Sequence, residues 1–180
     1  MVSHIIVLIL LVLVVLSHSK MMQFKSISGV NINSNIVRFS NTNIPMTIST
    51  IEPFRRSSNN NNFSIKYNVK DARTAIGYCF VSPPITTYMT PEYSSTSSNS
   101  YISFGGAGYI YPIKGRAKNG YSNGDTVTSS INWDNNTITF YVNNVLVYTS
   151  NISSTIDIAY PSISVDNGGV VDVTVSFNVK

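Results

Sequence analysis

Hydrophobic and polar residues alternate along most of this chain, and no other feature restricts its possible folds more. Residues 63–69 carry an aromatic or aliphatic side chain at every second position, and residues 171–179 carry valine or phenylalanine in the same way. Successive side chains of a β-strand point to opposite faces of a sheet, so a period of two predicts strands with one face in a core and the other in water. After residue 20, no window keeps the spacing of an amphipathic helix.

Further short apolar segments are separated by residues that favour turns. Glycine and asparagine tolerate positive φ angles and proline fixes φ, so pairs such as Gly105-Gly106 and Asn119-Gly120 mark turns. The segments that we expect to form strands cover residues 30–33, 36–39, 46–51, 101–104, 109–112, 145–148 and 156–160. Many short strands at this spacing predict an all-β protein built as an antiparallel sandwich of two sheets.

Residues 124–144 predict a β-hairpin within this sandwich. The segment runs from a Gly-Asp turn through a tryptophan to an Asp-Asn-Asn turn, and it returns with Ile138, Phe140 and Val142 on one face. Aspartate and asparagine at both ends of the return strand are typical of hairpin turns. We expect this hairpin to be scaffold, with its apolar face in the core and its tip, Asn135, exposed to solvent.

The hairpin and its neighbours resemble the SPRY domain, with the segments in the order found in that family. The matching segments are residues 63–69, 75–78, 109–111, 119–121, 124–127, 131–134, 137–141, 143–144, 159–164 and 170–177. The resemblance covers roughly residues 63–177, and residues 30–51 would supply the opening strands. It implies a two-sheet β-sandwich of the SPRY type, a concanavalin-like jelly roll, with no catalytic centre and with loops that bind a partner protein.

The chain departs from the family pattern at three places. Asn143-Asn144 replaces the usual Asn-Gly turn, which can still form because asparagine tolerates positive φ angles. The strand at residues 63–69 lacks the acidic residue often seen there, so no salt bridge to a partner is implied at that strand. Residues 109–111 carry tyrosines where the family has tryptophan.

The resemblance places the partner surface on loops around the Arg55-Arg56 pair, around residues 86–100 and around residues 114–123. The candidate binding residues are Arg55, Arg56, Tyr88, Tyr93, Lys114, Arg116 and Lys118. Residues 114–118 hold the densest positive charge in a chain whose net charge is +4, and such a segment can attract acidic partners or glycans. The competing explanation is that these charges only keep a surface loop solvated.

Tyrosines give a second reason to expect a binding surface. We expect Tyr88, Tyr93 and Tyr101 to be exposed, where a large ring with a polar tip can anchor a peptide or stack on a sugar. Because the same two-sheet architecture hosts sugar-binding proteins, a lectin-like carbohydrate-binding sandwich is the alternative function. Nucleic acid is not an expected partner, since only 11% of the residues are charged and no recognition motif is present.

The reactive residues of the chain argue against an enzyme. Both histidines, His4 and His18, precede residue 20, and Cys79 is the only cysteine. The rest of the chain therefore lacks Ser-His-Asp and Cys-His triads, histidine-based or multi-cysteine zinc sites, and any intrachain disulfide. Cys79 lies in an apolar segment, so we expect a buried, inert thiol. The chain also lacks the paired-glutamate pattern of a retaining glycosidase, and we expect neither a cofactor nor a metal.

The amino terminus predicts a secretory signal peptide. Residues 5–16 are an unbroken aliphatic run, and Ser17 and Ser19 stand at the third and first positions before a possible cleavage at Lys20. A run of this length suits the apolar part of a signal peptide and is short for a membrane span, which needs about 20 residues. We therefore expect a signal peptide at residues 1–19 and one secreted domain at residues 20–180. If the signal is not cleaved, it would hold the same domain at a membrane.

Three N-glycosylation motifs agree with secretion. They begin at Asn62, Asn135 and Asn151, and we expect each of them in a loop or turn where an oligosaccharide has room.

Overall fold

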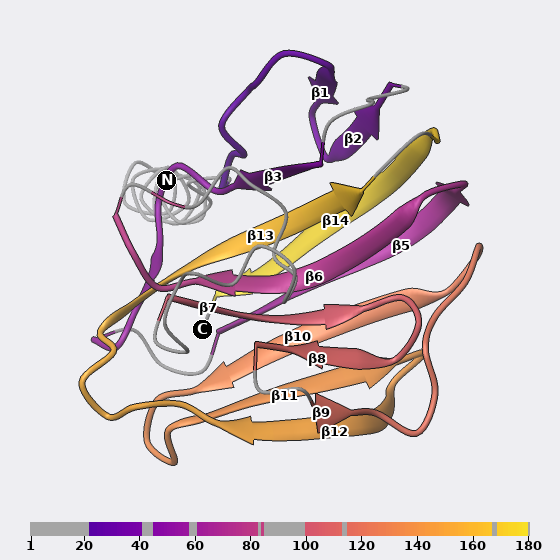
Figure 1. Ribbon diagram of the computed structural model, residues 1–180. Helices are drawn as coiled ribbons and strands as arrows, with labels where there is room; N and C mark the ends of the chain where they lie inside the picture. The colour runs from indigo at the N-terminus through magenta and orange to yellow at the C-terminus, as the bar shows by residue number, and fades with distance from the viewer. Residues whose placement is uncertain are drawn as a thin grey trace, which may run out of the picture.

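The structure is a computed structural model that describes residues 22–40, 45–57, 61–82, 84, 100–112, 115–166 and 169–179. The expected signal peptide lies outside these residues. Throughout the described ranges the regular structure is β-strand, and the strands form two antiparallel sheets, so the expected all-β sandwich is confirmed (Figure 1). No helix in the described ranges is long and apolar enough to cross a membrane.

The first sheet is built around the carboxyl-terminal strand and the hairpin that the sequence predicts. Its strand order is β1-β2-β14-β5-β10-β11-β12, and each neighbouring pair is antiparallel. The strands are β1 (Val30–Asn33), β2 (Ile36–Phe39), β5 (Asn61–Lys70), β10 (Thr126–Asn132), β11 (Thr137–Val142), β12 (Val145–Asn151) and β14 (Val171–Val179).

The second sheet packs against the first and has the order β3-β13-β6-β7-β8-β9, with β4 paired to the beginning of β13. Its strands are β3 (Met46–Ser49), β4 (Phe54–Arg55), β6 (Arg73–Cys79), β7 (Tyr101–Gly105), β8 (Tyr109–Tyr111), β9 (Gly115–Arg116) and β13 (Ile158–Asp166). The two-residue strands β4 and β9 are too short to give a period in the sequence, and we did not expect them.

The expected strands at 46–51, 109–112 and 145–148 form with different end points, and the largest differences concern one further strand and one predicted loop. The strand expected at residues 156–160 begins at Ile158 and continues through Pro161 to Asp166. Proline has no N–H to donate, and β13 tolerates it because Pro161 lies where the partner strand changes from β4 to β3. Asn62 lies in β5, between β10 and β14, rather than in the expected loop, because both neighbouring strands are long enough to pair with Asn61 and Asn62.

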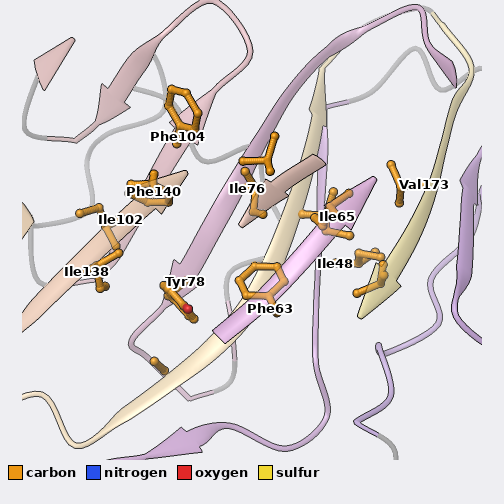
Figure 2. Close-up of a cluster of buried hydrophobic side chains, with 14 of the residues drawn as sticks. Ile48, Phe63, Ile65, Ile76, Tyr78, Ile102, Phe104, Ile138, Phe140 and Val173 are labelled. Atoms are coloured by element: carbon orange, nitrogen blue, oxygen red, sulfur yellow. The ribbon is translucent and has the colours of Figure 1, made fainter. Parts of the chain in front are cut away.

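The core lies between the two sheets and is filled by the residues that alternate toward it. Figure 2 shows the central side chains, which come from both sheets. The Phe63 ring packs edge-on against Tyr78 at a centroid distance of 5.4 Å, and Phe104 packs against Phe140 at 5.5 Å. Ile138 is also buried, as expected for the hairpin's apolar face. Val142, at the end of β11, is only half-buried.

The Asn143-Asn144 turn forms as the sequence predicts. The two residues have φ angles of 50° and 65°, the positive values that a two-residue hairpin turn of type I′ requires. The Asn143 side chain stabilises the turn, since its Oδ1 accepts a hydrogen bond from the Thr126 amide at 2.9 Å. Its Nδ2 donates to Asp125 Oδ1 at 2.7 Å.

The connections between strands collect at two opposite ends of the sandwich (Figure 1). The β5–β6, β7–β8 and β11–β12 turns lie at one end, which we call the β5–β6 end. The β10–β11 turn, β4 and the connection from β12 to β13 lie at the other end, which we call the β10–β11 end. This separation decides which candidate residues can share one binding surface.

Candidate functional site

The structure divides the candidate residues between the two ends. Arg55 and Arg56 lie at the β10–β11 end, where β4 pairs with β13. Arg116 ends β9, and Lys118 follows Ala117, whose amide donates to the Gly108 carbonyl in the β7–β8 turn at the β5–β6 end. The other candidates, Tyr88, Tyr93 and Lys114, lie outside the described residues. The candidates that the structure describes therefore do not form the single loop surface that the resemblance implies.

Arg56 is engaged inside the molecule. Its Nη1 donates to the Trp133 carbonyl at 2.8 Å and to Asn136 Oδ1 at 2.9 Å. Its Nε and Nη2 donate to the Ile156 carbonyl at 3.1 and 2.7 Å, and Nε also donates to Asp157 Oδ1 at 3.1 Å. The guanidinium carbon lies 5.2 Å from the centre of the Trp133 ring. Because its donors are used within the fold, we do not include Arg56 in a binding surface.

Tyr101 is buried, so the expectation that it is exposed is wrong. Only 2% of its surface is accessible, and it packs with Cys79 and Tyr160. Tyr101 pairs with Cys79 across β6 and β7, and the outer face of the second sheet is covered at this point rather than open to water. The same contacts confirm that the Cys79 thiol is buried.

The three glycosylation motifs lie toward the β10–β11 end. Asn135 is exposed in the β10–β11 turn, and Asn151 is exposed at the end of β12. Asn62 is half-buried in β5, where Ser64 of the same motif shares a 2.7 Å hydrogen bond with Thr128. Glycosylation at Asn62, Asn135 and Asn151 remains a prediction, and the structure favours the two exposed sites.

Tyr109 and Arg116 form an exposed pair on β8 and β9. The two strands align Tyr109 directly with Arg116, and the Arg116 guanidinium carbon lies 5.2 Å from the centre of the Tyr109 ring. Alternation in β8 buries Ile110 and turns Tyr109 and Tyr111 outward, where their rings stack at 6.0 Å. Tyr109 keeps 42% of its surface accessible. A cation over an aromatic face is favourable and holds the guanidinium in place.

The segment after β9 is fixed against the β7–β8 turn. The Ala117 amide donates to the Gly108 carbonyl at 2.7 Å, and the Tyr121 amide donates to the Gly106 carbonyl at 3.0 Å. Gly120 packs so closely on the Gly106 carbonyl that a Cβ would overlap it. Ala117 is buried, whereas the residues on either side of it, Arg116 and Lys118, are exposed.

Lys70 approaches the same turn from β5. A Cβ on Gly106 would lie 3.0 Å from Lys70 Nζ, and Nζ lies 5.7 Å from the centre of the Tyr121 ring. The Tyr121 hydroxyl is held by bonds within the core, among them a 2.9 Å bond that it donates to the Thr74 carbonyl. Burial lowers the pKa of the Lys70 ammonium. We define Lys70, Tyr109, Arg116 and Lys118 as the cationic corner.

Sequence reasoning identified only part of this corner. The density of positive charge in the sequence points to Arg116 and Lys118, whereas Lys70 and Tyr109 look like ordinary strand positions. Lys70 is one of two lysines on β5, and its approach to Gly106 depends on a contact between segments distant in sequence. The clearest available signal for Tyr109 was its place on the same face of β8 as Tyr111, two residues away.

Three buried tyrosines give the fold a measurable pH dependence. Burial raises the pKa of Tyr67 and of Tyr101 to about 12, and it raises the pKa of Tyr78 above its usual range. An unfolded chain releases these protons near pH 10, so the folded state holds more protons from about pH 10 to 12 and loses stability through that window as the pH rises. For Tyr67 alone, the rise from 10.0 to about 12 corresponds to about 3 kcal/mol. Lys70 has the opposite effect. Burial lowers the pKa of its ammonium, so below about pH 10.5 this group makes the folded state more stable as the pH rises.

An alkaline titration checks this expectation. Tyrosinate absorbance and circular dichroism should be followed together in the same sample. We expect the three buried phenols to ionise only as the sheet signal is lost, above about pH 10. Ionisation of all tyrosines with midpoints near the ordinary pKa of 10, with a native dichroism spectrum still present when ionisation is complete, would contradict the burial of these side chains.

Comparison with known proteins gives the fold of the chain. No protein-family model and no curated protein matches it. Among solved structures, the SPRY domain of human HERC1 matches with a TM-score of 0.63 and 13% identity, over 85% of this chain and 96% of that one. A second structure, a human SPRY domain, matches with a TM-score of 0.55 and 17% identity, over 84% and 96%. Stonustoxin matches with a TM-score of 0.60 and 9% identity, over 86% of this chain and 27% of the stonustoxin chain. The chain therefore has the fold of a SPRY domain, as the resemblance in its sequence implies.

Proposed function

We propose that this chain is a secreted, non-enzymatic SPRY-type module that binds a partner protein through the cationic corner. The fold supports a protein-interaction module. The exposed Tyr109–Arg116 pair carries the proposal, because tyrosine and arginine dominate the binding energy of protein interfaces. The pair is held by two hydrogen-bonded strands, so little side-chain freedom is lost on binding.

A non-enzymatic role is supported by the chemistry available to the chain. The cysteine is buried beside Ser49 and Tyr101, away from solvent. Both histidines belong to the proposed signal peptide, so the secreted domain would have no imidazole base. The proposal needs no cofactor.

Secretion rests on the signal peptide proposed at residues 1–19. It is tested by expressing the full chain in a eukaryotic host and sequencing the amino terminus of the protein recovered from the medium. A terminus near Lys20 supports cleavage. Recovery only from membranes, with Met1 or residue 2 at the terminus, would show an uncleaved anchor instead.

Partner binding is tested by cross-linking the secreted protein in extracellular fluid and identifying the proteins captured. We expect the double variant Tyr109→Ala/Arg116→Ala to lose capture of the partner by about tenfold or more, because it removes both members of the exposed pair. Arg38→Ala is the matched control, since Arg38 is an exposed arginine on β2 of the first sheet, whereas β8 and β9 belong to the second sheet.

The outcomes separate the candidate functions. Equal capture by the double variant and the control would place the interface elsewhere. Binding to a glycan array with no protein captured would favour the lectin-like function, in which the exposed Tyr109 ring stacks on a sugar.

A further inference from the structure

We propose that the cationic corner binds an acidic segment of the partner, with ligand carboxylates at Arg116, Lys118 and Lys70. The inference rests on the proposed function and names the chemistry that the corner recognises. The first observation is the position of the three cations, which all belong to segments that contact or adjoin the β7–β8 turn. Arg116 pairs with the residue that begins β8, Lys118 follows Ala117 bound to Gly108, and Lys70 covers Gly106.

Within the part of the chain that the structure describes, no ion pair involves a cation of the corner. Among the described residues, the ion pairs join Arg56 to Asp157 at 3.1 Å and Arg73 to Asp166 at 3.8 Å. Neither pair includes a cation of the corner. The elements that carry Tyr109, Arg116 and Lys118, from β7 to residue 121, contain no aspartate or glutamate, whereas Asp71 directly follows Lys70 at the end of β5. An incoming carboxylate would therefore meet positive charge with no competing acid from these elements.

The side chains are also arranged for a carboxylate. Arg116 is held over Tyr109, and a guanidinium presents paired N–H donors that match the two oxygens of a carboxylate. Lys70 is half-buried against Tyr121 and Gly106, so its ammonium has lost part of its hydration without gaining an anion. A carboxylate placed beside it would offset that loss. Exposed Tyr109 adds apolar contact beside the charges, which suits an extended peptide better than a free anion.

The partner segment is expected to be a peptide rather than a nucleic acid. Three cations and one exposed tyrosine provide few phosphate contacts, whereas binding along a phosphate backbone depends on neutralising many phosphates. A short run of glutamate or aspartate, with an apolar residue to pack on Tyr109, satisfies the corner with two or three carboxylates. The spacing of those carboxylates along the extended peptide would determine which acidic segments bind.

The test is fluorescence anisotropy with the purified full-length secreted protein. The probes are a labelled glutamate-rich peptide and the same peptide with glutamine at every glutamate. We expect the glutamate peptide to bind and Arg116→Gln and Lys118→Gln each to weaken binding by about tenfold. Lys70→Met, which keeps most of the alkyl chain, should weaken it by a similar factor.

Two control variants change the net charge equally at other places. Arg38→Gln matches Arg116→Gln, and Lys66→Gln matches Lys118→Gln, since Arg38 and Lys66 are exposed on the outer face of the first sheet. We expect both controls to bind the peptide within about twofold of the parent protein. Thermal unfolding of each variant shows whether it is folded. Lys118 makes no ion pair within the described residues, so its substitution tests the corner without disturbing the fold.

Each other result overturns the inference. Equal weakening by the controls would show attraction to net charge alone, and equal binding of both peptides would show that carboxylates are not recognised. Tighter binding of a single-stranded oligonucleotide than of the glutamate peptide would assign the corner to phosphate chains. If the acidic peptide fails but capture of the partner still depends on Tyr109 and Arg116, only the acidic class of ligand is wrong. If capture of the partner does not depend on Tyr109 and Arg116, the proposed function itself is wrong.

Discussion

Replacing Gly77 with alanine should destabilise the fold by about 3 kcal/mol or more, which is the largest single effect that we expect. Gly77 lies in β6, between Ser162 of β13 and Ser103 of β7. A Cβ at this position would overlap the Ile102 carbonyl oxygen and lie 2.7 Å from the Ser103 Cα. Both obstacles are backbone atoms of β7, which is itself bonded to β8, so the methyl group cannot be accommodated by a side-chain movement. Urea unfolding followed by circular dichroism measures the loss.

Gly105→Ala is the matched control for this substitution. Gly105 is also a buried strand glycine of the second sheet and pairs with Ala75, two positions from Gly77. Its Cβ would meet the edge of the Tyr111 ring at 3.2 Å, and a side chain can shift where a backbone cannot. We expect Gly105→Ala to change stability by less than about 1 kcal/mol, since the lower entropy of the unfolded chain partly offsets the contact. Equal stability of the two variants would contradict the close approach of β6 and β7.

The strands were predictable because their signal is local. In β5 and β14, alternation alone decides which residues enter the core, and the structure buries Phe63, Ile65 and Val173 as the period requires. The Asn143-Asn144 turn was predictable for the same reason, since its residues are the ones that tolerate the φ angles observed.

The functional surface was less predictable because it depends on contacts between distant segments. Alternation does not show that the outer face of the second sheet is covered at Tyr101, so its burial could not be inferred from the sequence. The order of strands separates Arg55 from Arg116, although both were expected in one loop surface. Arg56 seemed a free charge only because its partners, Trp133 and Ile156, lie far along the chain.

Among the described residues, we place the proposed binding surface at the cationic corner rather than at the β10–β11 end because of how the cations are bonded. A cation contributes most to a partner when its donors are not already used by the fold. Arg56 fails this condition because its donors bond to carbonyls and an amide oxygen of its own chain. Arg116 meets it, since its guanidinium lies over the face of Tyr109 and forms no ion pair among the described residues.

Arg56→Ala should destabilise the protein by about 2–4 kcal/mol, the second largest effect that we expect. Arg56 links its own segment, after β4, to two others. It donates to the Trp133 carbonyl and Asn136 at the β10–β11 turn, and to the Ile156 carbonyl before β13. Removing the guanidinium would leave these partly buried oxygens without their donors and uncover the Trp133 ring. Thermal and urea unfolding measure the change. Arg56→Lys should fall between alanine and the parent, because one ammonium cannot reach all of these acceptors.

A second substitution identifies which of the Arg56 contacts matters. The ion pair with Asp157 is largely exposed at its acidic end, where 75% of the side chain is accessible against 28% for Arg56. An exposed pair of this kind contributes at most about 1 kcal/mol, so Asp157→Ala should have a small effect. Arg38→Ala, an exposed arginine of β2, should stay within about 0.5 kcal/mol of the parent. If Asp157→Ala were as damaging as Arg56→Ala, the salt bridge would be the main contribution. If Arg56→Ala matched Arg38→Ala, Arg56 would be free to serve a partner, and the β10–β11 end would become a second candidate surface.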